Sequence, residues 1–378
     1  MPQTRRAALH QSRTLYVGVD VPKESIAVAY VAQAHGADVV SLGTVGTRQC
    51  AIDTRSRPLQ SKSQPRVCVY AAGPGGSWLY RSLTKTGDVG GVVAPAWMPK
   101  KAADRGKPDR RDARQLARLM RSGDLTPVSG PAGHDAALRD LRRARAETRH
   151  ALQPAKFRRK AWLRRHDIRY PGRATWGPAP LRWLSEVVWA TPAQQIVFQA
   201  DVRAVTDHTA RRQRLEPALQ EQGTAWRLCP VVAAVQALRG GPFTGAVTPV
   251  AELGDLPRVE NPRHLLTDLD LTPAEYSRGE RRRQGGSTQT GKTQARRAVV
   301  AGAWASRDPA QGSRHLPPRL AKLPKPIQDV SWKAQVRLCK RYRQLNARGK
   351  NPNQVVVAIA RELSACMWAI AKQVPVTA

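Results

Sequence analysis

The residues best suited to chemistry in this sequence are three aspartates. Asp109 and Asp112 lie three residues apart in a segment expected to be helical, Asp109–Arg121, so they share one helix face. Asp20 ends an apolar segment, Leu15–Asp20, that we expect to form a strand. Together the three acids offer the oxygen ligands that Mg²⁺ prefers. We therefore predict a Mg²⁺ site that acts on a polyanion; the alternative is that Asp109 and Asp112 pair with neighbouring arginines on a solvated helix.

The charge balance supports a polyanionic partner. The chain has 378 residues with 63 Lys and Arg against 28 Asp and Glu, a formal net charge of +35. An excess of this size opposes compaction unless a polyanion offsets it, which favours nucleic acid over a charge that serves only solubility. The length indicates two or three domains, and the 41% hydrophobic content is sufficient for their cores.

Cysteine usage and hydropathy indicate a cytoplasmic protein without a membrane partner. The five cysteines are widely spaced and form no C-x-x-C pair, which argues against a disulfide framework and a zinc ribbon. No uninterrupted apolar run approaches the ~20 residues needed to span a bilayer. Residues 1–13 are basic and lack the apolar centre of a secretory signal, so we expect a disordered basic arm.

The apolar patterns predict an α/β region at residues 14–125 that positions the three aspartates. Pro108 suits the first turn of the helix that carries two of them, because its missing N–H has no helical partner there. The expected strands are Leu15–Asp20, Ile26–Val31, Arg66–Tyr70 and Val89–Pro95, and the expected helices are Trp78–Leu83 and Asp109–Arg121.

The rest of the chain is expected to be mostly helical. Residues 131–225 predict a helical hairpin or coiled-coil arm, with an ordinary helical bundle as the alternative, and Pro154 is expected to interrupt it. Residues 228–305 predict a compact unit that begins with two short helices, similar to a helix-hairpin-helix, whose turn amides can hold a phosphate. A basic glycine-rich loop and a helix at Gln294–Trp304 follow. A proline-rich linker at 306–328 and basic helices at 329–378 complete the prediction.

Several ordered motifs resemble the DEDD transposases, insertion-sequence recombinases related to Piv-type DNA invertases. The resemblance runs from Leu15 to Lys372. Its motifs are YVGVD at Tyr16–Asp20, VYAAGP at Val69–Pro74, KPDRRDARQLARL at Lys107–Leu119, LTPAEYSRGERRRQGG at Leu271–Gly286 and ARRAVVAGAW at Ala295–Trp304.

This resemblance implies a fold and a mechanism. The fold would combine a RuvC-like, RNase H-like N-terminal domain, a coiled-coil arm and a mostly α C-terminal transposase domain. Four acids, Asp-Glu-Asp-Asp, would hold Mg²⁺; Asp20, Asp109 and Asp112 match the first, third and fourth. A serine in the C-terminal domain would attack DNA and form a phosphoserine link. The partners would be the element ends and target DNA, a structured guide RNA and further copies in a dimer or tetramer, on the bacterial nucleoid.

Two departures from the family pattern bear on activity. Ala71 stands where the family has its glutamate, and Arg278 stands where the attacking serine precedes Gly279. Ser277, one residue away, is the nearby candidate nucleophile. We therefore hypothesise that fold and nucleic-acid binding persist while strand cleavage is reduced or lost. The alternatives are a non-catalytic nucleic-acid-binding protein and a RuvC-like nuclease that uses only its N-terminal domain.

Basic and aromatic residues of the C-terminal region are candidate nucleic-acid contacts, because Arg and Lys neutralise phosphates and aromatic rings stack on bases. The segment Gly286–Thr293, GSTQTGKT, also satisfies the P-loop pattern. A P-loop must follow a buried strand, and the preceding GERRRQG predicts none, so ATP binding is not favoured. The candidate nucleic-acid contacts are Tyr276, Arg278, Arg281, Arg282, Arg283, Lys292, Arg296 and Arg297.

Overall fold

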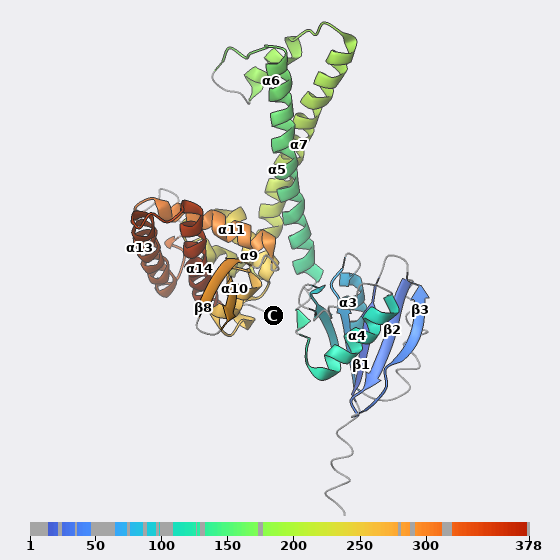
Figure 1. Cartoon of the computed structure of the whole chain (residues 1–378). Coiled ribbons are helices and arrows are strands. Elements are labelled where there is room, and N and C mark those ends of the chain that lie inside the picture. The colour runs from blue at the N-terminus through green and yellow to red at the C-terminus, as the bar shows by residue number, and fades with distance from the viewer. Residues whose placement is uncertain are drawn as a thin grey trace, which may run out of the picture. The chain divides into compact units, whose positions relative to one another are not determined.

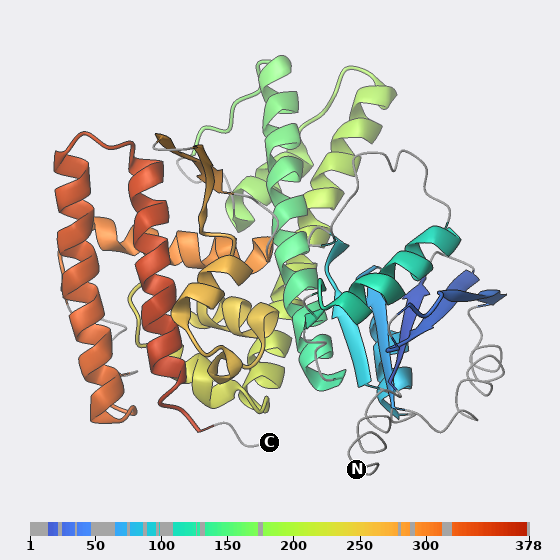
Figure 2. The same cartoon turned by 60° about the horizontal axis from the view of Figure 1, so that its bottom comes forward.

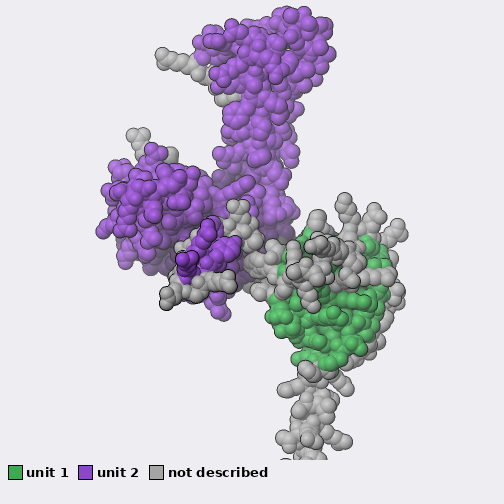
Figure 3. All heavy atoms as spheres, in the orientation of Figure 1, with its two compact units in different colours: residues 1–130 green, residues 131–378 purple. Residues whose placement is uncertain are grey.

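The computed structural model divides the chain into two compact units, residues 1–130 and residues 131–378 (Figure 3). Each unit is described by itself. The predicted basic arm at 1–13 lies outside the described residues. The structure describes residues 14–21, 25–34, 36–46, 65–73, 76–85, 89–95, 98, 109–125, 127–128, 133–172, 177–278, 281–287, 292–311 and 320–375.

A six-stranded mixed sheet in the order β3-β2-β1-β4-β5-β6 forms the centre of the first unit (Figure 1). β1 pairs antiparallel with β2 and parallel with β4, so it joins a meander to the parallel part of the sheet. This is an RNase H-like strand order, and the predicted α/β class is confirmed. The strands are β1 Leu15–Asp20, β2 Ser25–Ala32, β3 Val40–Gly46, β4 Arg66–Ala71, β5 Val89–Val93 and β6 Pro127–Val128.

Alternate side chains of the sheet point to opposite faces, and each face is covered by one helix. Leu15, Val17 and Val19 of β1 cluster with Leu79 of α3, which spans Gly76–Lys85. The other face is covered by α4, Asp109–Ser122, which lies across β1 and β2 (Figure 1). Residues of β1 that alternate with the α3 cluster therefore belong to the α4 face.

β3 is an edge strand absent from the sequence prediction. Its residues, VSLGTVG, are intermediate or exposed, so they lack the buried alternation that marks a strand in sequence. Its pairing with β2 also shifts register between Val28 and Ala29. Leu42 and Val45 pack against the core of the first unit but are only partly buried, so this strand is marked mainly by its backbone pairing with β2.

The second unit begins with two long helices that pack along each other, α5 Gly133–Arg165 and α7 Pro192–Thr224, with α6 Pro178–Glu186 between them in the chain (Figure 1). The prediction that Pro154 interrupts the first helix is wrong. A proline inside a helix removes one hydrogen bond and crowds the preceding turn. Here Leu152 and Ala155 bury themselves against Val205 of α7, and this packing holds the helix together across the proline.

The C-terminal helices share one large apolar core. Gly240 lies in the connection between α8 and α9 with φ +83°, and a Cβ there would lie 2.5 Å from the carbonyl oxygen of Gly302. This connection therefore packs directly against α11. The helical elements are α8 Cys229–Val235, α9 Phe243–Leu253, η2 Leu256–Arg258, α10 Pro262–Asp268, α11 Thr293–Ala303, η3 Trp304–Arg307, α13 Lys325–Ala347 and α14 Pro352–Ala371.

α14 is long and apolar enough to cross a membrane, but half of its apolar window is buried inside this unit. Val355, Ile359 and Ile370 belong to the shared core, which is typical of a central helix in a globular unit. Arg361 and Glu362 interrupt its sequence, so the segment did not stand out as an apolar run.

A two-stranded antiparallel sheet replaces the predicted glycine-rich loop. β7 spans Pro273–Arg278 and β8 spans Arg281–Ser287, and together they form a short ribbon (Figure 2). Tyr276 is paired with Arg283 across it. The strands carry arginine and glycine instead of alternating apolar residues, so the usual sequence signal is missing. The strand before the P-loop pattern, β8, has no buried residue among those described, so the expectation that no buried strand precedes the pattern is confirmed; residues 288–291 of that pattern are outside the described part of the chain.

Candidate functional site

The close packing of α4 against β1 depends on Gly18. A Cβ built on Gly18 would lie 2.1 Å from the carbonyl oxygen of Ala113 and 2.6 Å from the backbone nitrogen of Ala117. Both are backbone atoms of α4, so a larger residue would push the helix off the sheet. Ala113 also clusters with Ala27 and Ala29 of β2, so small residues line both sides of this contact.

The α4–β1 contact brings two of the predicted aspartates to the same end of the sheet. Asp20 is the last residue of β1 and lies two positions beyond Gly18, so it belongs to the α4 face. Its antiparallel partner is Ala27, which packs against Ala113. Asp112 directly precedes Ala113, in the first turn of α4. Both carboxylates therefore belong to the region where β1 ends and α4 begins.

Ala71 occupies the position beside Asp20 on the neighbouring strand. β4 runs parallel to β1 and pairs Tyr70 with Val19, so the next positions in register are Ala71 and Asp20. Val69, two residues earlier, packs against Leu116 of α4, which places position 71 on the same face. Adjacent strands lie about 4.8 Å apart. A methyl group thus stands where a carboxylate would adjoin Asp20.

The donor set at this end of the sheet is suited to a hard divalent cation but is incomplete among the described side chains. Asp20 and Asp112 supply carboxylate oxygens, whereas the side chain of Asp109 is outside the described part of the helix. Within the described residues, no three His, Cys, Asp or Glu side chains form a metal-binding group. Asp112 lies in the first turn of α4, where the helix dipole favours an acid.

The candidate nucleophile lies on the exposed hairpin of the second unit. The Ser277 hydroxyl donates a hydrogen bond of 2.6 Å to Oε1 of Glu275, two residues earlier in β7. Neighbouring positions of a strand belong to opposite faces, so Ser277 and position 278 do not share one. A one-residue exchange of the nucleophile would therefore move it to the other side of the hairpin.

The predicted nucleic-acid contacts differ in how far they are available to a ligand. Tyr276 is 72% exposed, and the arginines at 281, 283 and 297 are exposed. Arg296 is bound to the buried Asp270 carboxylate, with Nη1 2.8 Å from Oδ2. Lys292 is only partly exposed, and burial lowers its pKa to about 8. The hairpin is thus the most accessible basic surface among these candidates.

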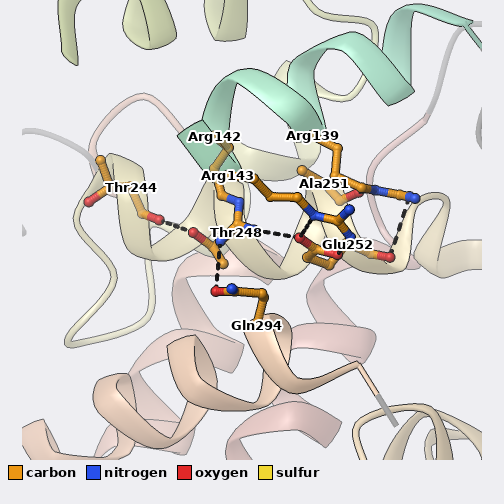
Figure 4. Close-up of polar contacts among 8 residues, drawn as sticks. All are labelled: Arg139, Arg142, Arg143, Thr244, Thr248, Ala251, Glu252 and Gln294. Carbon is orange, nitrogen blue, oxygen red and sulfur yellow. Dashed lines mark hydrogen bonds and ion pairs between the residues drawn. The ribbon is translucent and has the colours of Figure 1, made fainter. Parts of the chain in front are cut away.

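A buried ionic cluster at the base of the arm escaped the sequence prediction (Figure 4). Arg142 and Arg143 of α5 both donate to the Glu252 carboxylate of α9, with shortest distances of 2.5 Å and 2.8 Å. Arg139 donates to the Ala251 carbonyl at 2.8 Å. Burial alone would raise the pKa of Glu252, but the arginines hold that pKa below its usual value. The spacing of the arginines along one helix could have indicated a shared face. Their acidic partner could not be found from spacing, because Glu252 lies 110 residues after Arg142 in the sequence.

Sequence comparisons find similarity to transposases in both units. A DEDD transposase family model of the IS110 type matches residues 17–166, and a model described as "Transposase IS116/IS110/IS902 family" matches residues 234–315. The "Putative transposase y4qE" of Sinorhizobium fredii is 37% identical over 366 residues, covering 97% of this chain and 90% of that protein. The "Transposase for insertion sequence element IS1533" of Leptospira borgpetersenii is 27% identical over 342 residues, covering 89% and 98%.

The transposase matches cover both the sheet that carries Asp20 and the helical body that carries the hairpin. Near-complete mutual coverage with a relative above 30% identity extends this similarity over the whole chain. The chain therefore belongs to the IS110/IS116/IS902 family of insertion-sequence transposases.

Proposed function

We propose that this transposase cuts and transfers DNA strands by attack of a serine on a phosphodiester, assisted by Mg²⁺, and that cleavage by the chain as it stands is reduced. The observation that carries the proposal is the juxtaposition of Asp20, Asp112 and Ala71 on the α4 face of the sheet. Two of the four expected acids lie on this face, at the end of β1 and the start of α4. The position on β4 where the family has its glutamate holds the methyl group of Ala71.

Asp20, Asp109 and Asp112 are the residues that would hold Mg²⁺. When bound, the ion would stabilise the charge that develops on the phosphate and the leaving oxygen. The tight contact at Gly18 fixes the start of α4 against β1, and so sets the distance between the Asp20 and Asp112 carboxylates. Without a carboxylate at position 71, we expect weaker metal binding than the full set of acids would give.

Ser277 is the proposed nucleophile, with Glu275 accepting its proton. The hydroxyl already donates to the Glu275 carboxylate, which is the arrangement that a general base requires. In the reaction, the Ser277 oxygen forms a bond to phosphorus, the bond to the leaving strand oxygen breaks, and that oxygen takes up a proton. Ser277 lies on a different face of β7 from the position where the family motif has its serine, so we expect a slow reaction.

The proposed partners follow from the family and the charge. They are the DNA ends of the element, the target DNA and a structured guide RNA, all polyanions that suit a chain of net charge +35. We propose that α5 and α7 join copies of the chain into a dimer or tetramer, in the bacterial cytoplasm at the nucleoid.

A second candidate function is nucleic-acid binding without cleavage. Ala71 beside Asp20, and Ser277 one position from the motif serine, favour it. Such a protein would bind the ends or the RNA of an element and could block active oligomers.

Trapping of a covalent protein–DNA adduct tests the proposal. The unaltered chain and the double variant Ala71→Glu, Arg278→Ser would be incubated with Mg²⁺, DNA carrying the element junction and the flanking RNA. A weak adduct from the chain that strengthens in the double variant is expected, and Asp20→Asn should remove both. An adduct that persists in Asp20→Asn would contradict the acid site, and binding without any adduct in either protein would favour the second function.

A further inference from the structure

The β7–β8 hairpin is a surface without a partner in the described structure. Its two strands carry four arginines and one glutamate, and they present no continuous apolar side. Among the described elements, its strands pack extensively only against each other (Figure 2). An isolated two-stranded hairpin is marginally stable in water. A bound partner would therefore stabilise it, and its charge requires a polyanion.

Tyr276 makes one face of this hairpin aromatic. The Tyr276 Cα pairs with that of Arg283, and its ring leans diagonally towards Gly285, where a Cβ would lie 3.3 Å from ring atom Cε2. Because Gly285 has no side chain, the ring rests close to the backbone of β8. The tyrosine is nevertheless 72% exposed, so most of its surface faces solvent.

Of the arginines whose side chains the structure describes, two belong to the same face as this ring. Arg283 is directly opposite Tyr276, and Arg281 lies two positions from Arg283, so alternation places both on the Tyr276 face. Both are exposed. An accessible aromatic ring beside guanidinium groups combines the two contacts that single-stranded nucleic acid requires: a base can stack on the ring while its phosphates contact the arginines.

We propose that the Tyr276 face of the hairpin, formed by Tyr276, Arg281 and Arg283, binds unpaired nucleotides. The bases of a duplex are already stacked on one another, so the ring distinguishes an unpaired strand from a paired one. The inference rests on the proposed nucleic-acid function and adds which form of nucleic acid this surface takes. Unpaired DNA and unpaired RNA offer the same stacking chemistry.

The test measures binding of the full chain to labelled oligonucleotides by fluorescence anisotropy, without Mg²⁺. The probes are a 12-nucleotide thymidine strand, the matching uridine strand and a DNA duplex of the same length. Tyr276→Ala should weaken binding of the single strands about tenfold or more, because each base stacked on an aromatic ring contributes strongly. Binding of the duplex should change less than twofold. The ratio of the affinities for the thymidine and uridine strands identifies DNA or RNA as the preferred ligand of this face.

Two matched variants make the result specific. Tyr276→Phe keeps the ring and should retain single-strand affinity. Trp332→Ala removes another exposed aromatic residue, on α13, and should leave single-strand affinity unchanged. Equal losses for single strands and duplex in Tyr276→Ala, or no loss for either, would overturn the inference. Failure of the unaltered chain to bind any of the probes would instead overturn the proposed nucleic-acid function.

Discussion

Replacement of Gly18 by alanine should disrupt the candidate metal site and destabilise the first unit. The added methyl would lie 2.1 Å from the Ala113 oxygen and 2.6 Å from the Ala117 nitrogen, whereas real contacts of a Cβ start near 3 Å. Because both atoms are backbone, α4 must move away from β1 by about 1 Å. Overpacking of this kind costs about 1–3 kcal/mol. We expect a value near the upper end, since no flexible side chain can give way.

The same movement should weaken metal binding, because it displaces Asp112 from Asp20. A displacement of about 1 Å at a reacting centre can cost about 100-fold in rate. The stability of the first unit in the full chain would be measured by thermal unfolding, with hydrogen exchange of peptides from residues 14–125 as the readout. The affinity of the acid site for metal would be measured by Mn²⁺ titration.

Gly46→Ala is the matched control. Gly46 ends β3 in the same sheet, and no heavy atom lies within 4 Å of a Cβ built there. It should leave both measurements nearly unchanged. If Gly18→Ala were as well tolerated as Gly46→Ala, the close contact of α4 with β1 would be refuted, and with it the placement of Asp112.

Three further predictions concern charged residues of the second unit. Glu252→Gln should cost about 3–5 kcal/mol of unfolding free energy, because it leaves the buried Arg142 without its anion; urea unfolding that matches the unaltered chain would argue against the cluster. The pKa of Glu252 is depressed in the fold, so its contribution is present above its unfolded pKa of about 4.3 and is lost as the pH falls further; an acid transition no different from that of Glu252→Gln would contradict this. The pKa of Lys292 falls from 10.5 to about 8, so its buried charge costs about 3 kcal/mol at neutral pH and stability should rise between pH 8 and 10.5; Lys292→Met should abolish that rise, whereas exposed Lys322→Met should keep it.

The elements that position the acid site were predictable because they carry buried apolar residues. The apolar residues of β1, β4 and α4 recur at the spacing expected of strands or of a helix. The predicted ranges of these elements agree with the observed ones within a few residues. β3 and the β7–β8 hairpin lack such patterns, since their strands are defined by backbone pairing. Hydrophobic spacing therefore predicted the elements that have fully buried apolar side chains and missed the strands that lack them.

The contacts within the sites depended on register and long-range packing, which sequence spacing does not specify. The adjacency of Ala71 and Asp20 follows only once β4 is known to pair parallel with β1. Asp270 adopts φ +53° and binds Arg296. Asp is among the residues that tolerate this conformation, and neither the conformation nor the long-range ion pair could be predicted from spacing. The roles proposed for Asp109 and Ser277 stay predictions.

Metal binding by the acid site tests the central claim most directly. Mn²⁺ titration of the full chain, followed by electron paramagnetic resonance, would compare the unaltered protein with Ala71→Glu and Asp20→Asn. The account predicts the tightest binding in Ala71→Glu, where a carboxylate joins Asp20 on the α4 face, weaker binding in the unaltered chain and the weakest in Asp20→Asn. Equal affinity in all three proteins would contradict the placement of a divalent-metal site at the end of β1.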